Sequence, residues 1–129
     1  MINNPAQYDI NVYQDRDFSN TYIIKDESGI LIDISDWTCT AQLRPAYDSD
    51  ILLANFVIVK DTALSSITTK LTDTVTAAIS STNLISLTAT TTSSNMVWDL
   101  VVDTTGPPAE RFTLITGICT FHDTVTRAV

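Results

Sequence analysis

The chain has 129 residues, the size of one domain, and a formal net charge of −8, with 7 Lys and Arg against 15 Asp and Glu. Hydrophobic residues make up 44% of the chain and charged residues 17%, so it can fill a core and is not a disordered tail. The acidic balance argues against binding to DNA or RNA through phosphates and against docking on an anionic membrane surface.

Short segments of alternating apolar and polar residues, separated by polar turns, predict β-strands along most of the chain. One turn is explicit, because Gly29 ends the polar run Asp26-Glu27-Ser28-Gly29 and can supply a positive φ. Ser and Thr are abundant whereas Glu occurs twice and Lys three times, a composition that suits strands better than long helices. In chain order the expected segments are 8–12, 18–25, a brief 30–34, 37–43, 52–60, 66–71, 85–89, 96–103, 112–115 and 118–121, the last two pivoting near Gly117.

One segment favours a helix. Leu71, Val75 and Ile79 are spaced by four residues, and Asp73 is a plausible N-cap. Thr74 and Thr76 are poor helix formers, so we expect at most one short helical turn near residues 73–80.

Seven to nine short strands, with turn signals about every ten residues, predict a single all-β domain over residues 1–129, a β-sandwich or a small barrel. Residues 1–7 and 124–129 fall outside the strand pattern, and we expect them to form short terminal arms. Trp37 and Trp98 belong to alternating apolar sets, so both are expected in the core. The four tyrosines, Tyr8, Tyr13, Tyr22 and Tyr47, either pack in the core and at strand edges or form a patch that binds carbohydrate or protein.

The residues that could carry chemistry do not combine into a known motif. His122 is the single histidine and, with Asp123 beside it, makes only half of a metal site; an outward-facing strand position explains it better. Asp15 with Asp17, and Asp48 with Asp50, are typical of solvated turns rather than of a calcium loop. No serine lies in GxSxG, and three glycines do not make a phosphate-binding loop. We therefore expect no enzymatic activity, no catalytic residue, no cofactor and no metal.

The two cysteines, Cys39 and Cys119, lie within alternating apolar segments. No CxxC motif accompanies them, and the first residues lack the basic and apolar regions of an export signal. We expect two buried thiols without a disulfide, in a protein that folds in a reducing cytoplasm.

Several weak motifs occur in a consistent order along nearly the whole chain. A strand leads through an acidic turn to an aromatic-rich strand and an Asp/Gly hairpin. There follow, in order, an Ile-Asp-Ile-Ser-x-Trp segment, an Ala-x-Leu-Arg strand, an aromatic-Asp-Leu strand, a Leu-Gly hairpin and a Val-Thr-Arg ending. The corresponding stretches are 10–18, 25–29, 32–37, 41–45, 98–100, 114–118 and 125–127. In this order they resemble a family of small bacteriophage virion proteins from the tail and baseplate region. Residues 72–82 depart from the family pattern, which has an Ala- and Leu-rich helical turn there.

The resemblance implies an immunoglobulin-like antiparallel β-sandwich that serves as a structural adaptor in the upper baseplate or at a tail-fibre attachment point. Its partners would then be other tail, baseplate or fibre proteins in a symmetric, multi-copy assembly, with no nucleic acid and no membrane. The protein would be made in the host cytoplasm and reside in the tail of the virion. Two alternatives stay open: a capsid decoration or head–tail connector protein, and a carbohydrate-binding module for host recognition.

Partner contacts in such an adaptor are expected at loops and terminal arms outside the strand pattern. We expect the arms to be mobile in the isolated protein and to become ordered against other subunits. The candidate contact residues are Tyr47, Asp48, Asp50, Val125 and Arg127.

Overall fold

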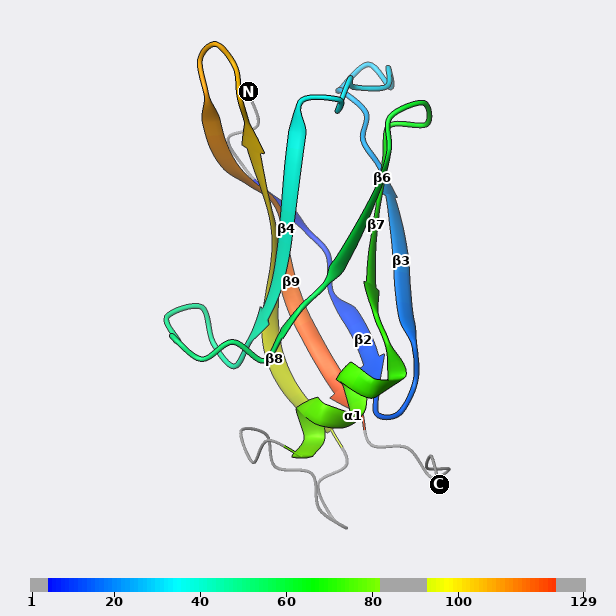
Figure 1. The fold of residues 1–129 in the computed structure, drawn as a ribbon, viewed down its shortest axis with the longest axis vertical. Helices are drawn as coiled ribbons and strands as arrows, with labels where there is room; N and C mark the ends of the chain where they lie inside the picture. The colour runs from blue at the N-terminus through cyan, green and yellow to red at the C-terminus, as the bar shows by residue number, and fades with distance from the viewer. Residues whose placement is uncertain (1–4, 82–92, 123–129) are drawn as a thin grey trace.

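A computed structural model describes residues 5–81 and 93–122 and shows two β-sheets that face each other across one apolar core, with a short helix at one end (Figure 1). The all-β sandwich expected from the sequence is confirmed. Among the described residues no helix has the length and apolarity to cross a membrane. The strands are β1 (Ala6–Gln7), β2 (Ile10–Tyr13), β3 (Phe18–Ile23), β4 (Trp37–Arg44), β5 (Ala54–Asn55), β6 (Val57–Asp61), β7 (Ser66–Leu71), β8 (Ser93–Thr104) and β9 (Glu110–His122), and the helix is α1 (Asp73–Ser81).

The larger sheet has the strand order β1-β9-β8-β4-β5, with β2 also paired to β9, and the smaller sheet has the order β3-β7-β6. All pairs are antiparallel except those of β1 and β2, which run parallel to β9. The larger sheet is therefore mixed, a feature that the antiparallel expectation did not include. Residues 6–7, expected in a terminal arm, belong to this sheet, because Ala6 and Gln7 pair with Ile115 and Thr116.

Residues 52–60, expected as one strand, form two strands in different sheets. β5 pairs with β4, β6 pairs with β7, and the chain crosses between the sheets at Phe56. The backbone N–H of Phe56 still donates to the Ala41 carbonyl of the larger sheet (2.9 Å), while its ring is buried. Because both sheets face the same core, apolar alternation continues through the crossing, and it cannot show where a strand changes sheet.

Residues 112–121, expected as two strands that pivot near Gly117, form the single long strand β9. The irregularity lies at Leu114, an extra residue in β9 that shifts the register opposite Leu100 and Val101 of β8. Before this β-bulge the apolar side chains occupy even-numbered positions, and after it they occupy odd-numbered ones. The break in the alternation made one strand resemble two. The hairpin expected around Gly117 is therefore wrong.

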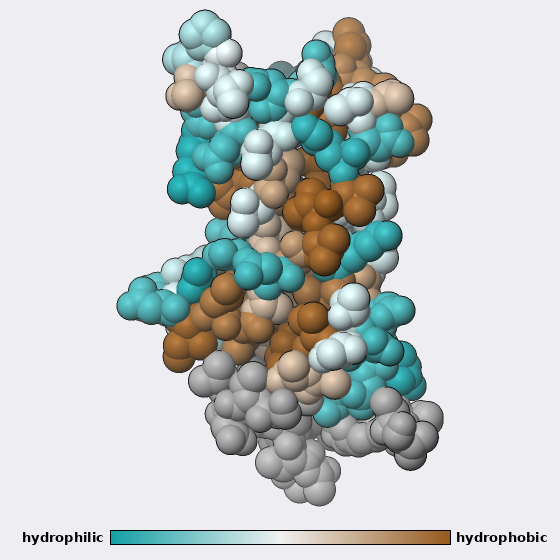
Figure 2. Space-filling view, viewed as in Figure 1, coloured by the Kyte–Doolittle hydropathy of each residue, from teal (hydrophilic) through white to brown (hydrophobic). Residues whose placement is uncertain are grey.

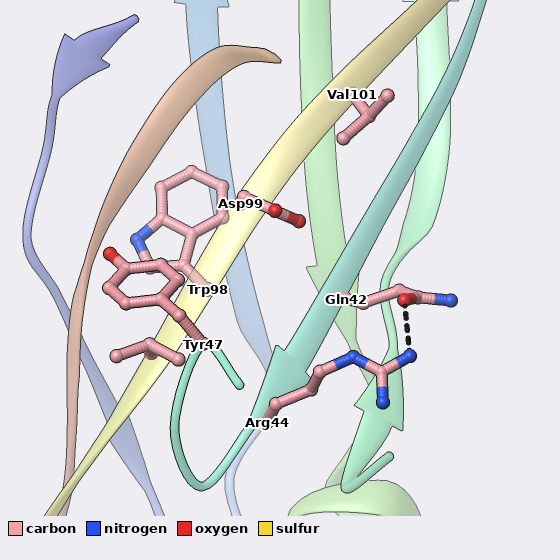
Figure 3. Close-up of a pocket in the computed structure, with 7 residues that line it drawn as sticks. Gln42, Arg44, Tyr47, Trp98, Asp99 and Val101 are labelled. Atoms are coloured by element: carbon pink, nitrogen blue, oxygen red, sulfur yellow. Dashed lines mark hydrogen bonds between the residues drawn. The ribbon is translucent and has the colours of Figure 1, made fainter. Parts of the chain in front are cut away.

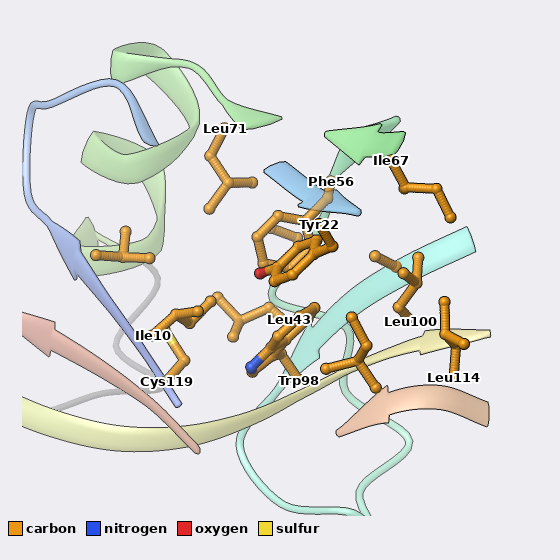
Figure 4. Packing of buried hydrophobic residues seen from close by; sticks show 14 of the residues in the cluster. Ile10, Tyr22, Leu43, Phe56, Ile67, Leu71, Trp98, Leu100, Leu114 and Cys119 are labelled. Atoms are coloured by element: carbon orange, nitrogen blue, oxygen red, sulfur yellow. The ribbon is translucent and has the colours of Figure 1, made fainter. Parts of the chain in front are cut away.

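The core forms between the inward faces of the two sheets (Figure 4). Trp98 is fully buried, as expected, and contacts the rings of Phe56 and Tyr22 at centroid distances of 5.8 and 6.0 Å. Trp37 is only half-buried at the margin, where it packs edge-on against Phe112 at 5.6 Å, so its expected place in the core is wrong.

The helix expected near residues 73–80 is present, but its nine residues exceed one turn. Side chains of the β2–β3 turn and the helix hold each other in place. The Asp17 carboxylate accepts the N–H of Asp73 (2.7 Å), and the buried Thr76 hydroxyl lies 2.9 Å from the Arg16 carbonyl oxygen and accepts the Arg16 N–H (3.2 Å). Tertiary contacts thus offset the weak helix propensity of threonine.

The remaining expectations have mixed outcomes. Gly29 has the positive φ (80°) expected of its turn, whereas the brief strand at 30–34 is reduced to one bridge between Lys25 and Leu31.

Both cysteines are free thiols; Cys119 is buried and Cys39 is half-buried. They pair with Met96 and Val102, six residues apart on β8, which separates them by about 20 Å along the sheet. The segments 85–89 and 124–129 lie outside the described residues.

Candidate interaction sites

A polar pocket lies on the outer face of the larger sheet, close to the end of β4 (Figure 3). The register places Gln42 of β4, Asp99 of β8 and Thr116 of β9 in one row across the sheet, with Arg44 and Val97 in the neighbouring row. The pocket has a volume of about 150 Å³. Its lining residues are Gln42, Arg44, Tyr47, Val97, Trp98, Asp99 and Val101.

Hydrogen bonds hold the β4 side of this pocket in one arrangement. The Arg44 guanidinium donates from Nη2 to Gln42 Oε1 (2.9 Å) and from Nη1 to the Ser49 carbonyl (3.3 Å). The Gln42 amide in turn donates from Nε2 to Asn55 Oδ1 (3.2 Å). A polar group held on both sides by neighbours is preorganised to meet a ligand, because little conformational entropy is left to lose.

Asp99 is the acid of the pocket and is half-buried between Val97 and Val101 on its own strand. Burial raises the pKa of its carboxyl group, and the positive charge of Arg44 opposes this effect. Within the part of the chain that the structure describes, the Asp99 carboxylate accepts no hydrogen bond and forms no ion pair. A half-buried carboxyl group in a concave surface, without a hydrogen-bonding partner among the described residues, is a candidate ligand-binding group.

Tyr47, a contact residue expected from the sequence, belongs to the loop that follows β4 and lies over the outer face of the same sheet. Its Oη lies 2.8 Å from Thr116 Oγ1 and donates to the Gly117 carbonyl at 3.3 Å. These bonds fix the ring beside Asp99 although 61% of Tyr47 stays exposed. Asp48 and Asp50 are exposed in the same loop and do not line the pocket.

A second surface, which we call the apolar end, consists of Ile23, Ile30, Leu31 and Leu64, with exposed fractions between 46% and 64%. The end of β3, the β3–β4 loop and the β6–β7 turn meet there. The Ile24 N–H donates to the Ser65 carbonyl (2.8 Å), and the Ser65 hydroxyl donates to the Ile32 carbonyl (2.6 Å). In the space-filling view, hydrophobic side chains lie at this end among hydrophilic ones, and other hydrophobic groups lie farther along the same face (Figure 2). Figure 1 places the apolar end far from the loop of Tyr47, beyond the other end of β4.

The border of the apolar end carries three exposed acids, Asp26, Glu27 and Asp61, and one exposed base, Lys25, whose backbone bridges to Leu31. Sequence reasoning missed this surface, because Ile30 and Leu31 follow a turn in a segment that resembles a buried strand. The neighbouring Leu64 belongs to the β6–β7 turn. Only the tertiary fold shows that these side chains are exposed and near one another.

The other candidates from the sequence have structural roles. His122 bonds to Asn11 Oδ1 at 2.9 Å from Nε2 and stacks on Tyr13 at 4.7 Å. In residues 5–81 and 93–122, no group of three or more His, Cys, Asp or Glu residues is placed to hold a metal ion. Val125 and Arg127 lie outside the described residues. Of the four tyrosines, Tyr22 is buried and the other three are exposed.

The sequence matches no family model, and it matches no curated protein.

Proposed function

We propose that this protein is a structural adaptor of a bacteriophage tail, in the baseplate or at a tail-fibre attachment point, and that it acts through protein–protein contacts. Two lines of support combine. The motif order of the sequence resembles small virion proteins of that region, and the apolar end is a surface suited to a protein partner. A group of exposed aliphatic side chains with a polar border is a common sign of such an interface.

The apolar end is the observation on which the proposal rests. Ile23, Ile30 and Leu64 are each at least 60% exposed, although shielding them from water would stabilise the molecule. The border is acidic on balance, with three carboxylates against the single amine of Lys25. This balance favours a partner with basic residues around an apolar centre, because complementary charges steer association and set its register. The net charge of −8 makes an acidic partner unfavourable.

The test replaces Ile30 and Leu64 together by serine in the virus genome. Because both side chains are exposed, we expect the double variant to fold with a free energy of unfolding within about 0.5 kcal/mol of the parent per site. We expect its incorporation into particles to fall at least tenfold, measured by mass spectrometry of purified particles.

The matched control is Val57→Ser, an exposed aliphatic residue at the start of β6, about 13 Å along the strand from Asp61. Incorporation of this control should equal that of the parent. Normal incorporation of the Ile30→Ser, Leu64→Ser protein would remove the apolar end from the proposed interface.

A further inference from the structure

The polar pocket offers a small ligand both kinds of hydrogen-bonding partner at short range. The Asp99 carboxylate is an acceptor, and Arg44 and Gln42 carry donors held in place by their neighbours. The side chains of Val97 and Val101 flank the carboxylate, and the Tyr47 ring borders the pocket on the side of β9. Donors, acceptors and an aromatic face therefore converge on one small volume.

From this arrangement we infer that the pocket binds one sugar residue of a neutral saccharide. Each sugar hydroxyl group is both a donor and an acceptor, so it can give its proton to Asp99 while it accepts from Arg44 or Gln42. The C–H faces of a sugar ring are apolar and suit contact with the Tyr47 ring. The Asp99 carboxylate is half-buried and accepts no hydrogen bond from the described residues. A hydrogen bond donated by a ligand therefore stabilises this group more than it would a carboxylate that already has a partner.

The pocket carries one charge of each sign, so a neutral ligand that both donates and accepts can use Asp99 and Arg44 together. The net charge of −8 and the Asp99 carboxylate disfavour an anionic ligand. The volume sets the size, because 150 Å³ is well below the roughly 300 Å³ at which typical small-molecule sites begin. The pocket thus suits a single ring, free or as one unit of a longer chain.

This inference does not depend on the proposed place of the protein in a virion, and its test uses the isolated protein. Nitrogen-labelled protein is titrated, with amide NMR signals as the readout, against the methyl glycosides of glucose, galactose, rhamnose, N-acetylglucosamine and glucuronate. We expect saturable shifts at Gln42, Asp99 and Val101 for at least one neutral glycoside. A dissociation constant of about 1 mM is the scale for so small a site. Glucuronate, which is anionic, should give none.

Two variants test the assigned groups. Asp99→Asn keeps the shape of the side chain and removes its charge, and it should weaken binding at least tenfold. Tyr47→Ala, in an exposed loop, should weaken binding similarly and leave the signals of the core unchanged. The matched control is Asp103→Asn, since Asp103 lies on the same face of β8, about 13 Å away, in an exposed ion pair with Arg111 (3.1 Å).

The control should bind like the parent. Three results would each overturn the inference: no saturable shift with any neutral glycoside, equal binding of glucuronate, or parent-like binding by both Asp99→Asn and Tyr47→Ala. Loss of particle incorporation in these variants without any glycoside binding by the parent would assign the pocket to a protein partner instead.

Discussion

Gly117 shows how one residue governs the attachment of the N-terminal strands. A Cβ atom at this position would lie 2.0 Å from the Tyr8 carbonyl oxygen and 3.0 Å from Trp98 Nε1. The same carbonyl accepts the indole N–H of Trp98 (2.9 Å), which satisfies the polar atom of a fully buried ring. The glycine in the strand thus marks a close approach of two backbones and not a turn.

We expect Gly117→Ala to destabilise the protein by about 3 kcal/mol or more, because the new methyl group meets backbone atoms that cannot move without breaking the Trp98 bond. Gly29→Ala is the comparison. Apart from its two chain neighbours, no described residue has an atom within 4 Å of a Cβ at Gly29, so only the positive φ is costly, at about 1 kcal/mol. Urea unfolding measures both, and equal losses would contradict the close approach.

The two thiols differ in burial, and this difference predicts their reactivity. Burial raises the pKa of Cys119 to about 12; burial also raises the pKa of Cys39, and the charge of Lys60 opposes that rise. In the native protein at pH 8, Ellman's reagent should modify Cys39 slowly and Cys119 only after unfolding. Native modification of Cys119 at the rate of Cys39 would contradict its burial.

The raised pKa of Cys119 also predicts how stability depends on pH. The folded protein keeps the thiol proton up to about pH 12, whereas the unfolded chain loses it near pH 9, so the free energy of unfolding should fall as pH rises above 9. The slope from this group is at most about 1.4 kcal/mol per pH unit. Cys119→Ala should show a flatter decline in urea unfolding between pH 9 and 10.5, and an unchanged slope would argue against the shift.

At the scale of elements, the two N-terminal strands contribute unequally. Both residues of β1 are exposed, whereas Ile10 and Val12 of β2 are buried against the core. We expect deletion of residues 1–7 to leave a folded domain, and deletion of residues 1–13 to abolish folding, because it removes two buried aliphatic side chains and the β2–β9 pairing. Circular dichroism and thermal unfolding distinguish the outcomes, and a folded protein lacking residues 1–13 would contradict this role of β2.

The helix depends on its contact with the β2–β3 turn more than on its own sequence. Thr76→Val removes the hydroxyl that contacts Arg16 and keeps the shape, so we expect a loss of about 1–3 kcal/mol in urea unfolding. Thr74→Val changes an exposed position of the same helix and is the control. A similar effect of both substitutions would show that helix propensity, not the buried hydrogen bond, determines stability.

Alternation in the sequence predicted most elements because each strand has one face in the core. The location of β2, β3, β4, β7 and β8 follows from this period of two. The alternation misplaced strand boundaries at two residues. At Phe56 the chain changes sheets while the same side of the chain keeps facing the core, so the alternation shows no break. At Leu114 a bulge shifts the apolar side chains from even-numbered to odd-numbered positions, so the alternation shows a break inside one strand. Parallel pairing of β1 and β2 with β9 joins chain segments more than a hundred residues apart, which local patterns cannot show.

At the scale of the whole molecule, the fold separates two surfaces that the sequence could predict only in part. The sequence predicted Tyr47 as a contact residue because it lies in a loop. Its neighbours Gln42, Arg44 and Asp99 lie in strands, where the sequence shows them only as the polar residues that alternate with apolar ones. Their convergence depends on the register between β4 and β8. The apolar end likewise depends on the end of β3, the β3–β4 loop and the β6–β7 turn, which only the fold brings together.

The proposal that this acidic sandwich is an adaptor in a phage tail is tested most directly by counting its copies in purified virus particles. Quantitative mass spectrometry with isotope-labelled peptides of the chain, referred to the major capsid protein, gives that number. We expect about six copies per particle or a small multiple of six, the number that the resemblance to baseplate proteins implies for a part of a symmetric assembly. Absence of the chain from particles, or hundreds of copies as in a capsid decoration protein, would contradict the proposal.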